Sequence, residues 1–461
     1  MLKIYNTLSG KKEAVRLKNG KSVQLFVCGP TVYDFSHLGH ARTYIAFDVI
    51  AKYLKEKWFD VFYLQNITDI DDKIIQRAQE KGLAPENLAR NFEKEYLQDM
   101  KSLRIDSVTK YARATDHIKE IIDQVKTLQE KGFAYKIADG IYYDISKFKK
   151  YGRLSKRTAL QAEDAISRID ESKEKRNKGD FCLWKFSKPD EPKWPSPWGE
   201  GRPGWHIEDT AITQKFFGAQ YDMHGGAKDL IFPHHEAEIA QREAISDKSP
   251  MVKYWIHTGF LTVNGKKMSK SLGNFVTIQD FSKNYSARIL RFLFTKSHYR
   301  SPADYMENSV AQAKKELARI DDFIARLDGI NHKLKKGHNL TLKAERAFET
   351  AMEDDFNTPK AIACIFDLIN QQNSLIDKNM LNQADAHDIL KFFKKIDRVL
   401  GFIFWPEAKE KTPEAVLSLA QERESQRKAS NWQKADELRK KITELGWQVE
   451  DTKDGPKLKK I

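Results

Sequence analysis

The sequence predicts an α/β protein in which a Rossmann-like parallel-sheet domain carries an insertion and is followed by a helical bundle and a small C-terminal module. Short apolar runs alternate with a helical pattern near the start of the chain. Beyond about Asp304 only helical spacing continues, until two further helices lead into a short strand-like end. We expect domain boundaries at residues 1–113 and 203–245 for the split sheet domain, 114–202 for the insertion, 246–304 for a linking domain, 305–402 for the bundle and 403–461 for the module.

The first elements are a strand, a loop and a helix. Val23–Cys28 (VQLFVC) is short and apolar, as a buried strand is, and Gly29-Pro30 marks a turn. A helical pattern then runs from about Leu38 to Lys57, and a second apolar run follows at Val61–Ile67. This alternation is typical of a parallel nucleotide-binding sheet, so we expect the ligand at the carboxyl ends of these strands.

A change of character between residues 114 and 202 predicts the insertion. This stretch holds a helical segment, a hairpin-like segment (FAYKIADGIYYDI), a charged run (DESKEKRNKGD) and a loop rich in Pro, Trp and Gly. The sheet pattern resumes at Tyr221–Phe232 and again around Tyr254–Leu261. The insertion therefore separates two halves of one domain.

The rest of the chain is predicted to be mainly helical. Apolar residues recur at helical spacing at Val310, Leu317, Ile320, Ile324 and Leu327. Further helices are expected at about 342–352, 359–371 and 386–400. Two more helices then precede Trp447–Asp451, an Asp454-Gly455 turn and a lysine-rich end, which predicts a small terminal module.

Charge and cysteine content narrow the functional classes. The 461 residues include 79 Lys and Arg against 65 Asp and Glu, a formal charge of +14, which fits a polyanionic partner but also a surface that is basic for solubility. The 3 cysteines are too few and too far apart for a disulfide framework. No apolar run reaches the roughly 18 residues of a membrane span, and the N-terminus has no apolar signal core. We therefore expect a cytoplasmic protein without membrane attachment.

Two histidines flank a glycine where the first helix is expected to begin, in the segment Pro30–His40 (PTVYDFSHLGH). A helix N-terminus attracts phosphate through its free amides and its dipole, and imidazole donors at His37 and His40 can hold phosphates as charge develops in a transition state. Gly39 would let a nucleotide ring approach the backbone. The alternative is that both histidines only cap the helix at the surface.

A lysine-rich loop, Lys266–Asn274 (KKMSKSLGN), precedes another helical stretch. Its ammonium groups are suited to neutralising a departing pyrophosphate, although a single loop of this kind is usually only solvated. Together with the earlier His-Leu-Gly-His, however, Lys-Met-Ser-Lys-Ser forms the paired signature of class I aminoacyl-tRNA synthetases, which the chain closely resembles. The resemblance implies catalytic, phosphate-stabilising roles for His37, His40, Lys267 and Lys270.

A third group of residues combines three kinds of zinc ligand. Cys28 ends the first strand, and in the segment Phe232–Glu238 (FPHHEAE) the residues His234 and Glu238 stand four apart, on one face of a helix. Thiolate, imidazole and carboxylate all bind zinc. Taken singly, such a cysteine is more often a small buried hydrophobe, and such a segment more often an ordinary helix start.

The whole chain resembles the cysteinyl-tRNA synthetase family. The resemblance is carried by long motifs at Gly29–Asp34 (GPTVYD), Asn66–Lys73 (NITDIDDK), Gly201–Glu208 (GRPGWHIE), Phe232–Glu238 and Asp354–Pro359 (DDFNTP). It implies that L-cysteine is activated with ATP and Mg²⁺ and transferred to tRNA(Cys), and that the enzyme is a monomer. In that family a zinc ion binds the thiol of the substrate, and the resemblance places three of its ligands at Cys28, His234 and Glu238.

The expected fourth zinc ligand departs from the family pattern. Most members have a cysteine directly after Trp-His-Ile-Glu, where this sequence has Asp209. Aspartate is a competent zinc ligand, so we expect one zinc ion held by Cys28, Asp209, His234 and Glu238. The alternatives are that Asp209 points away and the metal has one ligand fewer, or that no metal binds. Because zinc distinguishes a thiol from a hydroxyl better than packing distinguishes isosteres, no editing site is expected.

The resemblance also assigns the remaining pocket residues. It places cysteine binding at Cys28, Gly29, Thr68 and Trp205, and it implies that the helical bundle binds the tRNA and the terminal module its anticodon. In that module Trp432 could stack on an unpaired base. A hydrophobic anchor between the terminal helices is an equally good interpretation of Trp432, and ordinary core packing is the alternative for Trp205 and His224. ATP binding is implied for Thr31, His37, Gly39, His40, His224, Gly225, Gly226, Asp229, Lys267, Ser269 and Lys270.

Two other functions share part of this pattern. A related ligase that joins cysteine to an amino-sugar in mycothiol synthesis shares the catalytic half, but its members lack the full C-terminal end that this chain has. A non-catalytic RNA-binding or regulatory relative would explain Asp209 as a lesion. Intact His37, His40, Lys267 and Lys270 argue against it, because a binding module has no need of both phosphate-binding segments.

Overall fold

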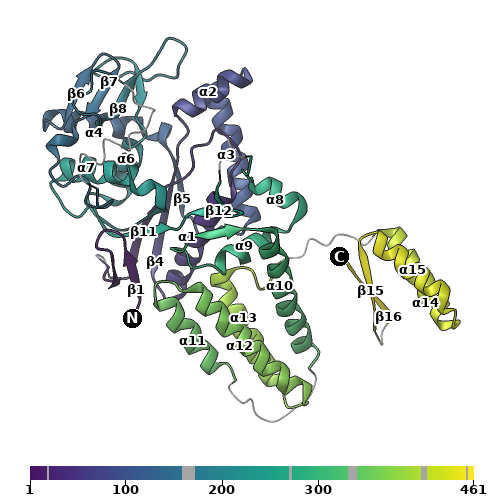
Figure 1. The fold of residues 1–461 in the computed structure, drawn as a ribbon. Helices are drawn as coiled ribbons and strands as arrows, with labels where there is room; N and C mark the ends of the chain where they lie inside the picture. Colours follow the sequence, from purple (N-terminus) through teal and green to yellow (C-terminus); the bar gives the residue numbers. More distant parts are fainter. Residues whose placement is uncertain are drawn as a thin grey trace. The chain divides into compact units, whose positions relative to one another are not determined.

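The computed structural model describes residues 1–17, 20–157, 172–268, 273–330, 340–405, 413–452 and 455–460. The chain divides into two compact units, Met1–Phe404 and Trp405–Ile461. The larger unit contains a parallel sheet, an antiparallel sheet and a helical bundle, and the smaller unit contains two helices and a hairpin (Figure 1). The α/β class predicted from the sequence, with a Rossmann-like sheet followed by helices, is confirmed. The finer domain boundaries within the larger unit stay a prediction.

A five-stranded parallel sheet forms the centre of the larger unit, in the order β11-β10-β3-β4-β5. Its strands are β3 (Ser22–Val27), β4 (Asp60–Ile67), β5 (Lys110–Arg113), β10 (Tyr221–Ala227) and β11 (Val252–Thr258). The neighbours β3 and β10 are far apart in sequence, so segments from both sides of the intervening chain complete one sheet. Cys28 follows β3 directly and therefore stands at the carboxyl edge, where a parallel sheet binds ligands.

Helix α1 (Leu38–Glu56) connects β3 to β4 and is covered on more than one side. It contacts strands β4 and β10 as well as helices α9 (Ala287–Thr295) and α13 (Gln383–Leu400). Most of its residues are therefore buried, including the charged Arg42 and Asp48, whereas a surface helix buries only one apolar stripe. The helix begins with a capping box that His37 and His40 form.

Between β5 and β10 the chain builds a four-stranded antiparallel sheet, in the order β6-β7-β8-β9. Its strands are β6 (Ala134–Ile137), β7 (Gly140–Tyr143), β8 (Phe181–Phe186) and β9 (Gly201–Pro203). Helices α4 (Ile118–Glu130), α6 (Ile207–Phe217) and α7 (His234–Ser246) share its apolar core, which includes Ile121, Trp184 and Ala237. Helices α6 and α7 thus lie between the two sheets and carry Asp209 and His234 to the edge of the central sheet.

A smaller three-stranded sheet follows, in the order β13-β12-β14. Its strands are β12 (Leu261–Val263), β13 (Lys266–Lys267) and β14 (Ala303–Tyr305), and α8 (Ile278–Asn284) and α9 lie between β13 and β14 in the sequence. The N-terminal hairpin of β1 (Lys3–Asn6) and β2 (Lys11–Ala14), and helices α2 (Asp72–Lys81) and α3 (Pro85–Ser102), complete this half of the unit.

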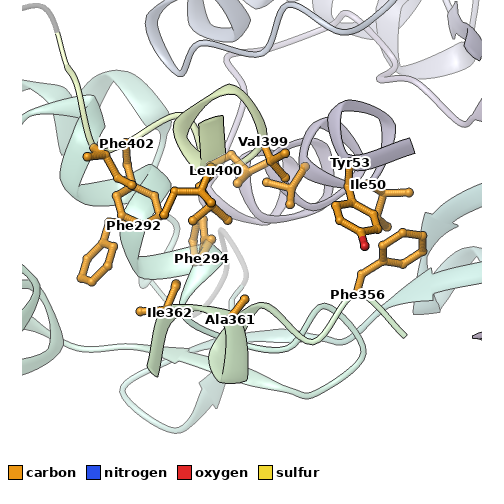
Figure 2. Close-up of a cluster of buried hydrophobic side chains, with 14 of the residues drawn as sticks. Ile50, Tyr53, Phe292, Phe294, Phe356, Ala361, Ile362, Val399, Leu400 and Phe402 are labelled. Carbon is orange, nitrogen blue, oxygen red and sulfur yellow. The ribbon is translucent and has the colours of Figure 1, made fainter. Parts of the chain in front are cut away.

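The helical bundle has no separate core. Helices α10 (Glu307–Asp328), α11 (Leu342–Glu353), α12 (Thr358–Asp377) and α13 occupy the lower part of Figure 1. A single apolar cluster includes residues of both the bundle and the central sheet. Figure 2 shows part of it, with Ile50 and Tyr53 of α1 facing Phe356 and with Phe292 of α9 beside Phe402. Helix α1 is therefore fixed to the sheet and to the bundle by the same core.

A buried ion pair reinforces this junction. Asp48 of α1 and Arg291 of α9 are both fully buried, and their side chains meet at 2.5 Å. Arg291 also donates through Nε to Leu400 O at 2.7 Å and through Nη1 to Leu103 O at 2.8 Å. Removing either residue would leave the other buried charge without this partner, which is costly. The pair therefore constrains how α1, α9, the end of α13 and the segment after α3 pack together.

The smaller unit consists of α14 (Glu414–Lys428), α15 (Trp432–Glu444) and the hairpin of β15 (Trp447–Thr452) and β16 (Gly455–Lys460). Its core contains Val416, Ile442 and Trp447. Trp432 lies outside this core and is 60% exposed, so it does not anchor the terminal helices to each other. In neither unit does any described helix have the length and apolar character needed to cross a bilayer.

Candidate functional site

Strand ends of the central sheet and the start of helix α1 surround a cavity of about 480 Å³. Ser269 and Lys270 lie outside the described residues. The predicted site residues that line the cavity are Cys28, Gly29, Thr31, His37, Gly39, His40, Thr68, Trp205, Asp209, Asp229, His234 and Lys267. The structure thus brings together residues that are up to about half the chain apart in sequence.

His37 and His40 cap helix α1 and also line the cavity. The His40 backbone N–H donates to His37 Nδ1 at 3.3 Å, and the His37 backbone N–H donates to His40 Nδ1 at 3.3 Å. Their rings stack with centroids 3.8 Å apart. Helix capping and phosphate binding are therefore compatible roles, because the capped helix start is itself part of the cavity wall.

The capping hydrogen bonds also fix which ring nitrogen can act on a ligand. Because Nδ1 of each histidine accepts a hydrogen bond, the ring proton must sit on Nε2. Burial and the neighbouring His37 lower the pKa of His40 well below its usual value. His40 is therefore neutral at pH 7 and offers a bound phosphate one Nε2–H donor.

Near the carboxyl end of β3, four buried donor atoms lie within 4.8 Å of one another, from Cys28, His234, His235 and Glu238. Cys28 Sγ is 3.1 Å from His235 Nε2 and 4.0 Å from Glu238 Oε1. His234 Nε2 is 3.3 Å from Glu238 Oε1. One thiol, two imidazoles and a carboxyl group in this arrangement are compatible with zinc.

Asp209 adds a fifth donor to this cluster. Its Oδ2 lies 3.2 Å from Cys28 Sγ and 3.0 Å from His234 Nε2. The alternative in which Asp209 points away from the site is therefore wrong. Its position in the first turn of α6 directs the carboxyl group toward the end of β3, as a cysteine at the same position would be directed.

The cluster contains buried carboxyl oxygens that the hydrogen bonds of the described residues leave unpaired. Asp209 Oδ1 and Glu238 Oε2 are buried, and neither has a hydrogen-bond partner among the described residues. Burial, together with Asp209, raises the pKa of Glu238, and burial with Asp209 and Glu238 raises the pKa of the Cys28 thiol. Sealing two carboxyl groups beside a thiol is costly without a cation. A divalent metal ion would pair the free oxygens and favour the thiolate, so the residues present fit zinc.

His235 is the donor that the sequence analysis missed. Neighbouring residues of a helix point about 100° apart, so only His234 and Glu238 were expected to share a face. The cluster instead lies where α7 meets the strand ends, and His235 Nε2 lies 3.1 Å from Cys28 Sγ. Its Nδ1 is 2.8 Å from His257 Nε2. Two adjacent histidines at a helix start, beside a candidate ligand, were the available signal.

Two aromatic neighbours hold the ring of His234. His206 Nδ1 lies 2.8 Å from His234 Nδ1, which leaves His234 Nε2 directed toward Asp209 and Glu238. Trp205 stacks on the same ring with centroids 4.4 Å apart, and its indole lines the cavity. Contacts of this kind commonly fix the orientation and tautomer of a metal-binding histidine. Trp205 is therefore a wall of the pocket and not a residue of the apolar core.

The candidate cysteine-binding residues Gly29 and Thr68 lie on neighbouring strand ends. The Gly29 N–H donates to Asn66 Oδ1 at 2.5 Å, and a Cβ at position 29 would lie 1.7 Å from the Asn66 carbonyl oxygen. Only glycine fits there. The Thr68 hydroxyl donates to Glu208, and burial, with Asp209 next to it, raises the pKa of Glu208.

His224, Gly225 and Gly226 lie inside β10 and are not among the residues that line the cavity, so the expected ATP-binding turn stays a prediction. His224 is fully buried, and its ring stacks on Trp255 with centroids 4.2 Å apart. A Cβ would lie 2.3 Å from the Phe47 ring at position 225 and 2.8 Å from the His235 ring at position 226. Both glycines make room for protein rings, and His224 Nε2 lies 3.5 Å from Cys28 Sγ, beside the donor cluster.

Comparisons with known proteins agree with this arrangement. The family model described as "tRNA synthetases class I (C) catalytic domain" matches residues 14–315, and the model described as "DALR domain" matches residues 347–404. Proteins named "Cysteine--tRNA ligase" from Thermococcus onnurineus and Methanococcus maripaludis strain C7 are each 44% identical to the chain. The alignments cover 100% of this chain and 99% and 100% of those relatives.

Solved structures show the same fold at low sequence identity. Mycobacterium tuberculosis methionyl-tRNA synthetase in complex with methionyl-adenylate has a TM-score of 0.59 at 16% identity, covering 83% of this chain and 88% of that one. A LeuRS of Agrobacterium radiobacter K84 in a ternary complex has a TM-score of 0.64 at 11% identity, covering 84% and 85%.

Gly226 and Gly39 lie next to different histidine rings, so a methyl group added at each position should impair a different property of the protein. Gly226→Ala would press on the His235 ring, which lies 3.1 Å from Cys28 Sγ, so we expect the displaced ring to disturb Cys28, reduce the metal content of the purified protein and leave MgATP affinity unchanged. Gly39→Ala would press on the His37 ring, where a Cβ would lie 2.8 Å away, so it should weaken MgATP binding and leave metal content unchanged. Metal analysis and calorimetric titration of both variants check this. Weakened ATP binding in Gly226→Ala with normal metal content would contradict this and support the expected ATP-binding turn.

Proposed function

The chain belongs to the cysteine–tRNA ligase family of class I tRNA synthetases, and we propose that it activates L-cysteine with ATP and joins it to tRNA(Cys). A carboxylate oxygen of cysteine attacks the α-phosphorus of ATP, and pyrophosphate leaves. A ribose hydroxyl of the terminal adenosine of the tRNA then attacks the acyl carbon of cysteinyl-adenylate, and AMP leaves. One observation carries the proposal: a single cavity joins a phosphate-binding helix start to a buried, thiol-selective donor set.

The phosphate end of ATP is assigned to the wall made by α1 and β13. His37 and His40 present Nε2–H donors there, and Lys267 supplies positive charge as pyrophosphate departs. The Asp229 carboxylate can accept hydrogen bonds from the ribose or the adenine amine. Mg²⁺ accompanies ATP as part of the substrate. Thr31 and Gly39 complete the described wall, and Ser269 and Lys270 are assigned from the sequence signature.

The metal site is assigned to Cys28, Asp209, His234 and Glu238, with one zinc ion per chain. When bound, zinc supplies an affinity for the thiol of cysteine that a serine hydroxyl does not share. The residues around it position the rest of the substrate: Trp205 walls the pocket, and Gly29 and Thr68 lie where the ammonium group of cysteine can be held. His235 remains beside Cys28 as a donor that the four-ligand set does not use.

The C-terminal part of the chain is assigned to the tRNA. The DALR-domain match covers residues 347–404, which include helices α11, α12 and α13. Trp432 is exposed at the start of α15, and Lys428 and Lys434 are its basic neighbours in sequence, a combination suited to stacking on an unpaired base. One chain supplies every proposed ligand, so the proposal requires only a monomer. Because charging of tRNA serves translation, we assign the activity to the cytoplasm.

The rival functions are less well supported. A mycothiol-type cysteine ligase would not need the segment that matches the DALR domain, and the relatives named as cysteine–tRNA ligases align over the whole chain. A non-catalytic relative would have no use for Asp209 in contact with Cys28 and His234.

The proposed activity is tested by pyrophosphate exchange into ATP and by charging of a tRNA(Cys) transcript. We expect both reactions to require L-cysteine, to be unsupported by L-serine, and to be lost after the metal has been removed with a chelator. Readdition of zinc should restore them. A folded protein that binds the transcript but shows no cysteine-dependent exchange would contradict the proposal and favour the regulatory alternative.

Asp209 is tested as a metal ligand by comparison with another buried carboxylate. Asp209→Ala should lose zinc and raise the KM for cysteine, whereas the KM for ATP should stay the same because the phosphate wall is untouched. Asp222→Ala is the control, since Asp222 is equally buried but accepts a hydrogen bond from Gln24 in the sheet. Asp209→Cys should keep zinc.

His235→Ala distinguishes the two possible donor sets by metal content. Zinc retained in His235→Ala but lost in Asp209→Ala supports the assigned set. The reverse pattern would assign the ligand role to His235 instead, and well under one zinc per chain in the unaltered protein would remove the metal site altogether.

A further inference from the structure

Arg42 is a buried cation that the proposed function leaves without a role. It lies in α1, two residues after His40, and is only 2% exposed. Its guanidinium donates to backbone carbonyls alone: Nε to Gly259 O at 3.2 Å, and Nη2 to His298 O and Tyr299 O at 3.4 Å each and to Ser301 O. No carboxylate oxygen of a described residue lies within 4.0 Å of it.

These carbonyls belong to the two segments that enter the three-stranded sheet. Gly259 precedes β12, and Ser301 precedes β14. In that sheet Thr262 of β12 pairs with Asp304 of β14 on one side and with Lys267 of β13 on the other. The two segments approach closely, because a Cβ at Gly259 would lie 2.3 Å from Ser301 O. Arg42 therefore joins helix α1 to the base of the sheet that carries Lys267.

The residues that follow the lysine-rich segment Lys266–Asn274 are hydrogen-bonded to the start of the same helix. The Leu38 N–H donates to Val276 O at 3.1 Å, and the Ile278 N–H donates to Ser36 O at 2.8 Å. These bonds surround His37, whose ring also meets Phe275 edge-on at 5.3 Å. The chain before Lys267 and the chain after Asn274 are thus both fastened to the start of α1, which bears His37 and His40.

The charge of Arg42 acts on the cavity as well. Burial lowers the pKa of Arg42 to about 10, so the guanidinium stays protonated at pH 7. Arg42 is part of the cavity lining. Direct attraction of a polyanion by this charge would not depend on Lys267, whereas an effect through the position of Lys267 would.

We propose that Arg42 is a positioning residue that sets Lys267 against His37 and His40, so that the three side chains can bind one triphosphate. This inference rests on the proposed function, because it gives the cavity ATP as its ligand. Arg42 lies outside both sequence signatures, and its contacts bring the two signatures together in one site. Removing the guanidinium should leave Lys267 in place on β13 but free its sheet from the helix.

Arg291 provides a matched structural control. It too is a buried arginine that donates to backbone carbonyls, Leu400 O and Leu103 O. It differs in being paired with Asp48 and in lying outside the cavity lining. An effect on stability alone should therefore be common to Arg42 and Arg291, and an effect that depends on Lys267 should be confined to Arg42.

The test is a double-mutant cycle read by calorimetric titration with MgATP in the absence of cysteine and tRNA. We expect Arg42→Met to weaken MgATP binding about tenfold when Lys267 is present and less than about twofold in the Lys267→Ala background, since coupled residues give non-additive effects. Arg291→Met should lower the melting temperature with little change in MgATP affinity in either background. Arg42→Lys, which keeps the charge but not the forked donors, should fall between Arg42→Met and the unaltered protein and serves if Arg42→Met does not fold.

Each outcome decides between named alternatives. Equal losses of MgATP affinity with and without Lys267 would show that Arg42 acts independently of it and would overturn the inference, as would a protein that does not bind MgATP. Because the titration needs no cysteine, non-additive binding without cysteine-dependent exchange would contradict the proposed function and leave this inference standing. Additive binding with normal exchange would do the opposite.

Discussion

The site depends on one electrostatic constraint: two carboxyl groups and a thiol are sealed between the central sheet and helices α6 and α7, with oxygens that no described residue satisfies. Within the protein alone this arrangement is unfavourable, and the raised pKa values of Cys28 and Glu238 express that cost. A bound cation would offset this cost and make the same arrangement of donors favourable. The position of β3, the direction of α6 and the contact of Trp205 with His234 all serve to hold these donors together.

Helix α1 is the second element on which the site depends. Its first turn carries the histidine pair, its next turn carries Arg42, and its middle is fixed by Asp48 and the apolar core that it shares with the bundle. Because the bundle and the parallel sheet have one core, the part of the chain that matches the DALR domain is rigidly joined to the helix that lines the cavity. No separate element is therefore needed to connect these two parts of the larger unit.

Local patterns predicted much of this molecule, and close packing decided the rest. The apolar run before Cys28, the helix after Ser36 and the run at Val61–Ile67 correspond to β3, α1 and β4 within one or two residues, because burial and capping are encoded by neighbouring residues. The contacts of His235 and of the glycines of β10 could not be predicted from the sequence, for the opposite reason. Their roles depend on rings contributed by distant elements, such as Phe47 and His257, which no local period reveals. The choice between two interpretations of Trp432 likewise required its exposure in the folded unit.

In the proposed function, the buried donors hold a zinc ion that recognises the thiol of cysteine. X-ray absorption at the zinc edge of the purified protein tests it most directly, because this measurement counts sulfur neighbours of the metal. We expect one sulfur neighbour in the free protein, contributed by Cys28, and a second after cysteine is added, with no change after serine is added. An unchanged sulfur count with saturating cysteine, or a metal with no sulfur neighbour at all, would contradict it.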